Sequence, residues 1–367
     1  MRIAFFADSY KPYLSGVTNS MELLVNELRE LGHRVYVFAP RYPKHVDTDP
    51  DIVRFPSIPV GYPKFRLALP YVNRLPEVDL IHSHSPFQSG LLARYLARKR
   101  KVPFVYTFHT LFTRYVHYAR FVPEPLSKLS MVTYIRQFCR GCQVLVSPSE
   151  LARRVLRSWG IKERIEIVPS GVDLSLLPKD IKAVRQKLIK KHHLPANSKN
   201  LLYVGRISKE KNLPFILKAF KKIKTPAQLL LVGGGPHLKD FKKKKIKNVH
   251  FLGEVNYPEV LSYYALGDIF VFASLTETQG LVLVEAKAVG LPVVALFAGG
   301  LTTSVRSGID GYLTPRNQKD FIEHIERLLT DEALRQHMGL AAKEDAHNNF
   351  SSSVVAKEME SIYNSVI

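Results

Sequence analysis

The chain has 367 residues, of which 46% are hydrophobic, and its 53 Lys and Arg against 32 Asp and Glu give a formal net charge of +21. This length suffices for two α/β domains of ordinary size, and no uninterrupted apolar stretch reaches the roughly 18 residues that indicate a membrane span. The charge excess predicts attraction to an anionic polymer or surface.

The first half of the chain alternates short apolar runs with helical patterns. A helical pattern at residues 19–31 follows the first run and ends before Gly32, a common helix terminator. Alternation of this kind indicates a parallel sheet covered by helices on both faces. The strands predicted for this half are residues 2–7, 35–39, 78–82, 102–109 and 144–147.

The second half repeats the alternation after a turn-rich segment, Val168–Asp173, which indicates an interdomain linker. A basic helical stretch at residues 180–193 opens this half. The predicted strands here are residues 201–205, 227–233, 249–252, 269–273 and 292–295. The chain therefore divides into two successive α/β domains, at residues 1–170 and 171–349.

The most informative motif is a pair of carboxylates, Glu277 and Glu285, on either side of Gly280. Glu277 is predicted in a strand-to-helix loop, and Glu285 about two turns into the helix. The free N–H groups of Gly280, Leu281 and Val282 at the helix start would form an anion site. One segment thus offers a phosphate cradle and two acceptor carboxylates, as a sugar nucleotide requires. The spacing alone is equally compatible with a buried loop that carries two solvated glutamates.

Other candidate binding residues lie at strand ends, where open α/β sheets bind ligands. Gly16 in the first loop would let the backbone approach a ligand, or it is a turn glycine. Arg206 and Lys211 follow a strand that ends at Gly205, and their cations could converge on a diphosphate. Without further context this segment is only a basic loop. His109 ends a strand, where a lone histidine is more often structural.

The sequence predicts no metal site. His82 and His84 alternate along a strand end, but no Asp follows them as a binuclear hydrolase would require. Cys139 and Cys142 lack the second cysteine pair that completes a zinc site, so we expect two reduced cysteines in a cytosolic protein. Residues 233–236 form a glycine turn that does not match a P-loop.

Taken together and in order over nearly the whole chain, these segments resemble the retaining family 4 glycosyltransferases. The resemblance implies their glycosyltransferase B fold, an α/β architecture of two facing Rossmann-like domains with an interdomain cleft. It also implies that a C-terminal helix at about 350–367 packs back on the N-terminal domain. Two departures occur: Lys287 stands where an apolar residue is usual, and residues 298–303 lack the common acidic residue.

The resemblance also implies residue roles. Arg206 and Lys211 would neutralise the leaving diphosphate, whose negative charge grows as the glycosidic bond breaks. Glu285 would accept both ribose hydroxyls, and Glu277 would accept hydroxyls of the donor sugar. His109 would contact this sugar and align it with the acceptor. With two cationic side chains on the diphosphate, we expect no cofactor and no divalent metal. The co-substrate would be a nucleotide-sugar, UDP-glucose.

Two basic–aromatic segments of the first half, Val60–Arg74 and Tyr115–Phe138, are candidates for binding the acceptor and an anionic bilayer. Their apolar positions would equally suit packing on the domain core. Together with the net charge, the pattern resembles members that glucosylate diacylglycerol, with phosphatidylinositol mannosyltransferases as near relatives. The candidate contact residues are Tyr62, Phe65, Arg66, Arg74, Arg114, Tyr115, Tyr118, Arg120, Lys128 and Arg136.

We therefore expect a hexosyltransferase that moves glucose to a membrane lipid such as 1,2-diacylglycerol, peripheral on the inner face of the cell membrane. A glycosyltransferase with a soluble sugar, polysaccharide or small-metabolite acceptor is the first alternative. A non-enzymatic nucleic-acid-binding protein is the second. It would explain the lysines but not the carboxylates and glycine loops, and no nucleic-acid-binding module is recognisable.

Overall fold

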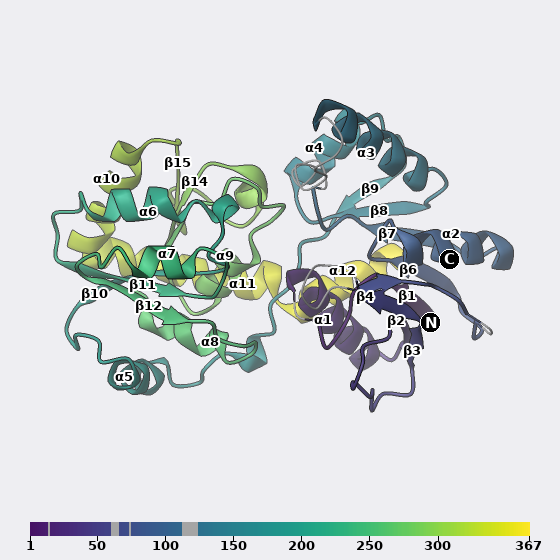
Figure 1. Ribbon diagram of the computed structural model, residues 1–367, viewed down its shortest axis with the longest axis horizontal. Helices are drawn as coiled ribbons and strands as arrows, with labels where there is room; N and C mark the ends of the chain where they lie inside the picture. The colour runs from purple at the N-terminus through teal and green to yellow at the C-terminus, as the bar shows by residue number, and fades with distance from the viewer. Residues whose placement is uncertain (14, 60–65, 73–74, 112–123) are drawn as a thin grey trace. The chain divides into compact units, whose positions relative to one another are not determined.

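The structure, a computed structural model, describes residues 1–13, 15–59, 66–72, 75–111 and 124–367. The chain forms two units, each drawn in Figure 1. Unit 1 comprises Met1–Gly171 and Ser352–Ile367, and unit 2 comprises Val172–Ser351. The sequence places the domain boundary at residue 170 and the final helix near residue 350.

Unit 1 is built on a parallel sheet with the strand order β3-β2-β1-β6-β7-β8-β9. Its central strands are apolar on both faces, because helices cover both. β1 pairs with β2 and β6, and Ile3 lies beside Val35 and Leu80. The strands are β1 (Arg2–Phe6), β2 (Arg34–Pro40), β3 (Ile52–Phe55), β6 (Leu80–Ser83), β7 (Phe104–Thr107), β8 (Val144–Ser147) and β9 (Ile165–Ile167).

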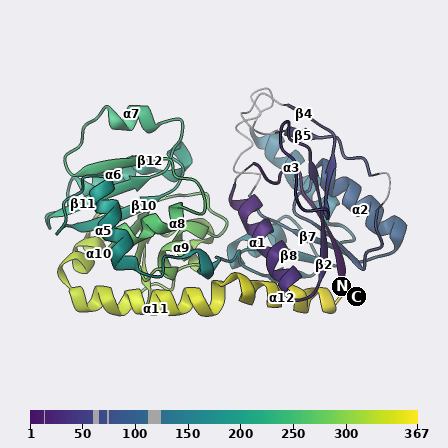
Figure 2. The same ribbon diagram turned by 90° about the horizontal axis from the view of Figure 1, so that it is seen from below.

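Helices from both ends of the chain cover one face of this sheet. α1 (Gly16–Glu30) and α12 (Ser352–Asn364) lie side by side there (Figure 2) and bury Met21, Val25 and Met359 against it. Ser15 caps the start of α1 in a capping box with Thr18. The other face packs against α2 (Gln88–Arg100), α3 (Glu124–Cys139) and α4 (Glu150–Ser158). A short antiparallel hairpin joins β4 (Ser57–Pro59) and β5 (Arg66–Ala68).

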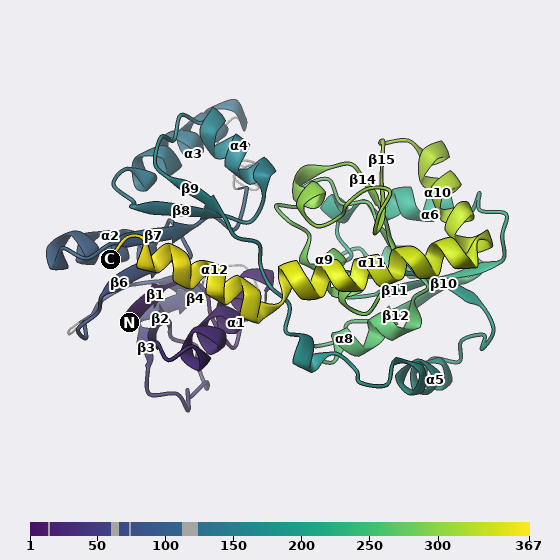
Figure 3. The same ribbon diagram turned by 180° about the vertical axis from the view of Figure 1, so that it is seen from behind.

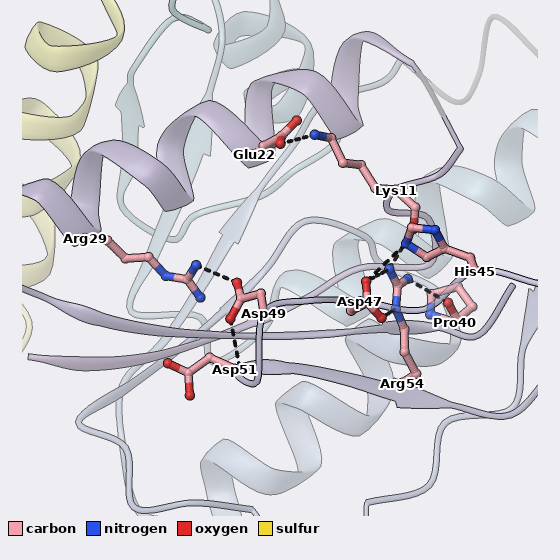
Figure 4. A network of polar contacts seen from close by, with 9 residues as sticks. All are labelled: Lys11, Glu22, Arg29, Pro40, His45, Asp47, Asp49, Asp51 and Arg54. Carbon is pink, nitrogen blue, oxygen red and sulfur yellow. Dashed lines mark hydrogen bonds and ion pairs between the residues drawn. The ribbon is translucent and has the colours of Figure 1, made fainter.

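A polar network fixes the connection between β2 and β3 (Figure 4). Arg54 donates to both carboxylate oxygens of Asp47, at 2.7 and 2.8 Å, and to the carbonyl oxygen of Pro40 at 2.9 Å. Arg29 of α1 donates to Asp49 at 2.6 Å. Because Arg54 is almost fully buried, these contacts supply the partners that its charge requires away from water.

Unit 2 has a parallel sheet with the order β12-β11-β10-β13-β14-β15. Figure 3 shows α11 running along α9 in this unit. The strands are β10 (Lys199–Val204), β11 (Ala227–Val232), β12 (Val249–Gly253), β13 (Ile269–Phe272), β14 (Val293–Leu296) and β15 (Gly311–Thr314). The helices are α5 (Ile181–Lys191), α6 (Leu213–Phe220), α7 (Leu238–Lys242), α8 (Val260–Tyr263), α9 (Leu281–Ala288), α10 (Gln318–Thr330) and α11 (Glu332–Phe350).

The strand order positions a ligand site in each unit. In both sheets the order reverses beside the first strand of the unit, between β1 and β6 in unit 1 and between β10 and β13 in unit 2. Doubly wound sheets of this order bind ligands at the carboxyl ends of the strands that flank the reversal. The predicted fold class, two Rossmann-like α/β domains, is confirmed.

Candidate active site

The loop after β10 and the glycine turn after β11 pack backbone against backbone. The Ile207 N–H donates to the Gly234 carbonyl at 2.7 Å. A Cβ on Gly233, whose φ is +138°, would lie 2.0 Å from the Gly205 carbonyl oxygen. A Cβ on Gly235 would lie 2.5 Å from the Ile207 carbonyl oxygen. Only glycine fits these positions, so the turn supports the loop that carries the predicted diphosphate-binding cations.

Arg206 and Lys211 lie in this loop at the carboxyl end of β10. Arg206 is exposed, and its carbonyl accepts a hydrogen bond of 2.9 Å from the buried Tyr203 hydroxyl. Lys211 closes a 3-10 turn, Lys209–Lys211, and its ammonium lies 5.9 Å from the centre of the Phe272 ring. A buried tyrosine thus fixes the backbone beside Arg206, and a β13 aromatic ring lies beside Lys211.

Lys211 forms an ion pair with Glu277, in the loop after β13. Both side chains are mostly buried, at 22% and 17% exposure. The Glu277 carbonyl accepts the Gly300 N–H at 2.8 Å, and a Cβ on Gly299 would lie 2.4 Å from that carbonyl oxygen. The loops that follow β10 and β13 therefore meet at the carboxyl ends of these strands, where the reversal of strand order predicts a ligand site.

Gly280 begins α9 in a conformation that favours glycine, with φ +84° and ψ 62°. A Cβ at this position would also lie 2.5 Å from a methyl group of Leu301. The first helical hydrogen bond runs from the Leu283 N–H to the Gly280 carbonyl, at 2.9 Å. Leu281 and Val282 therefore occupy the first turn of the helix, as the predicted amide cradle requires.

Glu285 lies on the buried side of α9 and accepts a hydrogen bond from the hydroxyl of Tyr264. Burial raises the pKa of this carboxyl above its ordinary value, and the bond from Tyr264 partly offsets the rise. No sequence pattern pairs Tyr264 with Glu285, because they are 21 positions apart and β13 and the ligand loop lie between them. Tyr264 thus orients the carboxylate that is predicted to bind ribose.

Lys287, the charged departure in the motif, is fully buried in an ion network. Its ammonium donates to the Ser304 carbonyl at 2.8 Å and to Asp310 at 3.0 Å, and it also pairs with Asp345 of α11. Arg306 donates to Asp310 at 2.7 Å. Lys287, two residues beyond Glu285, therefore connects α9 to α11 and to the loop before β15.

Three histidines gather at the carboxyl ends of β6 and β7 in unit 1. His84 Nδ1 and His109 Nε2 are 3.0 Å apart. His82 contacts the Tyr363 hydroxyl at 2.6 Å and the Thr107 hydroxyl at 2.7 Å. Burial lowers the pKa of His82 to about 3 and that of His109 to about 4. At pH 7 these rings are neutral.

The remaining predicted residues are less closely grouped. A Cβ on Gly16 would meet no atom within 4 Å. Arg66 donates to the Ser57 hydroxyl at 2.8 Å and to the Ser57 carbonyl at 2.7 Å, so the hairpin binds its guanidinium. Lys128 and Arg136 are exposed on α3. Tyr62, Phe65, Arg74, Arg114, Tyr115, Tyr118 and Arg120 lie outside the described residues.

α3 has apolar residues that pack on the domain core and apolar residues that are exposed. Phe138 is buried in the core, at 1% exposure, whereas Leu126 and Leu129 are 56% and 64% exposed. The C-terminal part of the helix therefore packs on the sheet. The part near Lys128 presents leucine side chains to the surroundings.

Among the described residues, the structure contains no helix long and apolar enough to cross a bilayer. Within the same residues, no group of three or more His, Cys, Asp or Glu side chains is placed to hold a metal ion. Cys139 and Cys142 are both buried free thiols, and burial raises the pKa of Cys142 to about 12.

Comparison with known proteins identifies relatives of both halves. Residues 14–176 match the family described as Glycosyltransferase Family 4, and residues 184–345 match Glycosyl transferases group 1. An alpha-monoglucosyldiacylglycerol synthase of Streptococcus pneumoniae is 34% identical over 320 residues, 80% of this chain and 71% of that protein. One of Acholeplasma laidlawii is 31% identical over 395 aligned positions, 99% of this chain and 96% of its own length.

The fold has counterparts among solved structures. The Anabaena protein HepE, solved in complex with UDP and glucose, aligns over the full length of both chains with a TM-score of 0.77. Its sequence is 19% identical, so the likeness concerns the fold.

Proposed function

The chain belongs to glycosyltransferase family 4 and is a hexosyltransferase, and from that premise we propose that it transfers glucose from UDP-glucose to 1,2-diacylglycerol. The proposal includes retention of the anomeric configuration. The observation that carries the proposed transfer is the ion pair between Lys211 and Glu277. It places a cation and an acceptor for sugar hydroxyls together at the carboxyl ends of the strands that flank the reversal in unit 2.

The geometry of unit 2 supports a nucleoside diphosphate sugar as donor. Lys211, Arg206 and the first turn of α9 would bind the diphosphate, whose charge grows in the transition state. The Glu285 carboxylate, already oriented by Tyr264, would accept ribose hydroxyls. Glu277 would exchange Lys211 for hydroxyls of the sugar. The structure of HepE with UDP and glucose supports this donor class.

We propose that this reaction needs no divalent metal, because Arg206 and Lys211 supply two positive charges at the diphosphate. Treatment with EDTA should then change the initial rate little. A complete loss that Mg²⁺ or Mn²⁺ restores would refute the metal-free mechanism.

The acceptor proposal rests on the relatives and on the surface of unit 1. Both relatives described above are named as synthases of a glucosyldiacylglycerol. The net charge of +21 and the exposed Leu126, Leu129 and Lys128 on α3 suit a protein that binds an anionic bilayer from one side. We place it on the inner face of the cell membrane as a peripheral protein.

Sedimentation with vesicles tests the membrane part of the proposal. We expect the protein to pellet with vesicles that contain anionic phospholipid and to stay in the supernatant with neutral ones. Each basic contact contributes about 1 kcal/mol, so three contacts would favour binding by roughly a hundredfold. Equal binding to both vesicles, or binding to neither, would favour a soluble acceptor.

The third expectation, a non-enzymatic nucleic-acid-binding protein, is discarded because the family is enzymatic.

A further inference from the structure

The histidines of unit 1 differ in how their ring nitrogens are satisfied. His82 has a hydroxyl partner on each nitrogen, from Tyr363 and Thr107. The ring centre of His84 lies 4.2 Å from that of His82, with the rings tilted by 33°, and 5.3 Å from that of His109. Its Nδ1 contacts His109 Nε2 at 3.0 Å, and within the described residues its buried Nε2 has no hydrogen-bond partner.

The contact between His84 and His109 couples the protonation of the two rings. A neutral imidazole carries one donor and one acceptor nitrogen, so only one of the two facing nitrogens bears a proton. If His84 Nδ1 bears it, the His109 proton is on Nδ1. If His109 Nε2 bears it, the His84 proton is on Nε2. Burial holds the pKa of both rings below the ordinary value, so each stays neutral and carries a single ring proton.

A small cavity lies beside these rings and offers His84 a second partner. It measures about 30 Å³, and His84, His109, Thr107, Ser20 and Ser170 line part of it. A space of this size can hold a water molecule where polar groups line it, as the hydroxyls of Ser20, Thr107 and Ser170 do on part of this wall. Water can donate or accept, so it would satisfy His84 Nε2 in either tautomer.

We propose that His84 is a positioning residue for glycosyl transfer: through Nδ1 it fixes the orientation and tautomer of His109, while a water molecule in the cavity satisfies Nε2. The inference rests on the proposed function and on the contact with the sugar that the family resemblance implies for His109. His84 then contacts no substrate itself. It determines whether His109 presents a donor or an acceptor to one.

Asparagine and glutamine separate the two contacts of His84. The amide of Asn is attached at Cγ, as Nδ1 is, so His84→Asn keeps a polar group facing His109. The amide of Gln lies one atom farther out, so His84→Gln moves it away from His109 while the site stays polar. His84→Leu removes both contacts. His82→Asn is the matched control, because His82 is also buried, lies two residues before His84 at the end of β6, and bonds Tyr363 and Thr107.

Long-range ¹H–¹⁵N correlation spectra of histidine-labelled full-length protein read the tautomer directly, with His109→Gln used to assign the signals. We expect a single His109 tautomer in the wild type, in His84→Asn and in His82→Asn, and averaged ¹⁵N shifts in His84→Leu and His84→Gln. An unchanged His109 tautomer in both His84→Leu and His84→Gln would overturn the proposal. If His84→Leu fails to fold, His84→Gln decides alone.

Transfer kinetics on the same variants separate this inference from the proposed function. The loss of one neutral hydrogen bond predicts a roughly two- to tenfold lower kcat in His84→Leu and His84→Gln, with recovery in His84→Asn and little change in KM for the donor. If the tautomer changes while kcat does not, His109 takes no part in transfer, and the positioning role fails with it. If no variant, including the wild type, transfers sugar while the tautomer responds as expected, the fault lies with the proposed substrates.

Discussion

Lys211 and Glu277 form a mostly buried ion pair across 66 positions of sequence, and the pair joins the loops that follow β10 and β13. These strands flank the reversal of strand order in unit 2. Each side chain therefore already binds a group that resembles its proposed ligand. Lys211 binds an anionic carboxylate in place of the diphosphate, and Glu277 accepts from an ammonium in place of sugar hydroxyls. A bound donor would replace both partners at once, with its diphosphate on Lys211 and its sugar hydroxyls on Glu277.

Replacing either proposed diphosphate ligand should slow transfer severely. Loss of one charge-assisted donor costs about 2.7–4 kcal/mol of barrier, so Arg206→Ala and Lys211→Ala should each lower kcat by roughly 10²–10³. Lys209→Ala is the matched control, because Lys209 is an exposed lysine of the same turn. Initial rates at saturating donor give the answer. Turnover near that of the wild type in Arg206→Ala or Lys211→Ala would remove that residue from the mechanism.

Substitutions of the two carboxylates of the motif, Glu277 and Glu285, should have different effects on donor binding. Glu285→Gln should weaken binding of UDP alone by roughly 10- to 100-fold, the range for a lost hydrogen bond to a charged group. Glu277→Gln should change UDP affinity little and should relax discrimination between donor sugars. Calorimetric titration with UDP, together with competition between UDP-glucose and UDP-galactose, measures both effects. If Glu277→Gln loses UDP affinity and Glu285→Gln keeps it, the two roles are inverted.

Nucleotide binding should depend on pH through Glu285. Ribose hydroxyls donate to the ionised carboxylate, and burial raises its pKa above the ordinary 4.5. UDP affinity should therefore fall as pH drops through this raised pKa, by at most about tenfold per pH unit. The difference between the wild type and Glu285→Gln removes the titration of UDP itself. Parallel pH profiles for the two proteins would contradict the assignment.

The same raised pKa has a consequence for stability with the opposite sign. Because the folded state holds this proton more tightly than the unfolded chain does, the contribution of Glu285 to the free energy of unfolding should increase as pH falls from the raised pKa towards 4.5. Urea denaturation of the ligand-free wild type and Glu285→Gln across this window measures that contribution as a difference.

Lys287 should be a stability residue. Lys287→Met leaves Asp310 and Asp345 buried with less positive charge, and breaking a buried ion network in this way costs about 3–5 kcal/mol. Lys343→Met, an exposed lysine on α11, should change the free energy of unfolding by less than about 0.5 kcal/mol. Urea denaturation distinguishes them. Equal stability of the two variants would mean that Arg306 alone satisfies both aspartates.

Much of the fold follows from local sequence, because strands buried on both faces are continuous apolar runs. The strands predicted at residues 2–7 and 269–273 are observed as β1 and β13. β9 and β15 were not predicted, since each has three or four residues and mixed polarity. The hairpin of β4 and β5 was also missed, because its strands have three residues each and contain Pro59 and Arg66.

The site could be predicted only in part, because its motifs are local whereas its partners are distant in sequence. Spacing located Glu277 and Glu285, but no local pattern pairs Glu285 with Tyr264 or Lys287 with Asp345. His84 and His109 belong to separate sequence segments, and parallel pairing of β6 with β7 brings them into contact. Arg66, which is predicted to contact the membrane, donates to Ser57 across the hairpin, and no local pattern indicates that bond.

Glucose transfer to a lipid acceptor can be measured on vesicles. The full chain is incubated with UDP-glucose and vesicles that carry 1,2-diacylglycerol among anionic phospholipids, with Lys211→Ala as the inactive control. We predict an α-linked glucosyldiacylglycerol, identified by mass and by its anomeric NMR coupling. Its rate of formation should fall as salt rises from about 0.05 to 0.5 M, because the attraction to the bilayer is screened. No glucosyl lipid under any of these conditions, with UDP-glucose consumed on a soluble acceptor instead, would contradict the account.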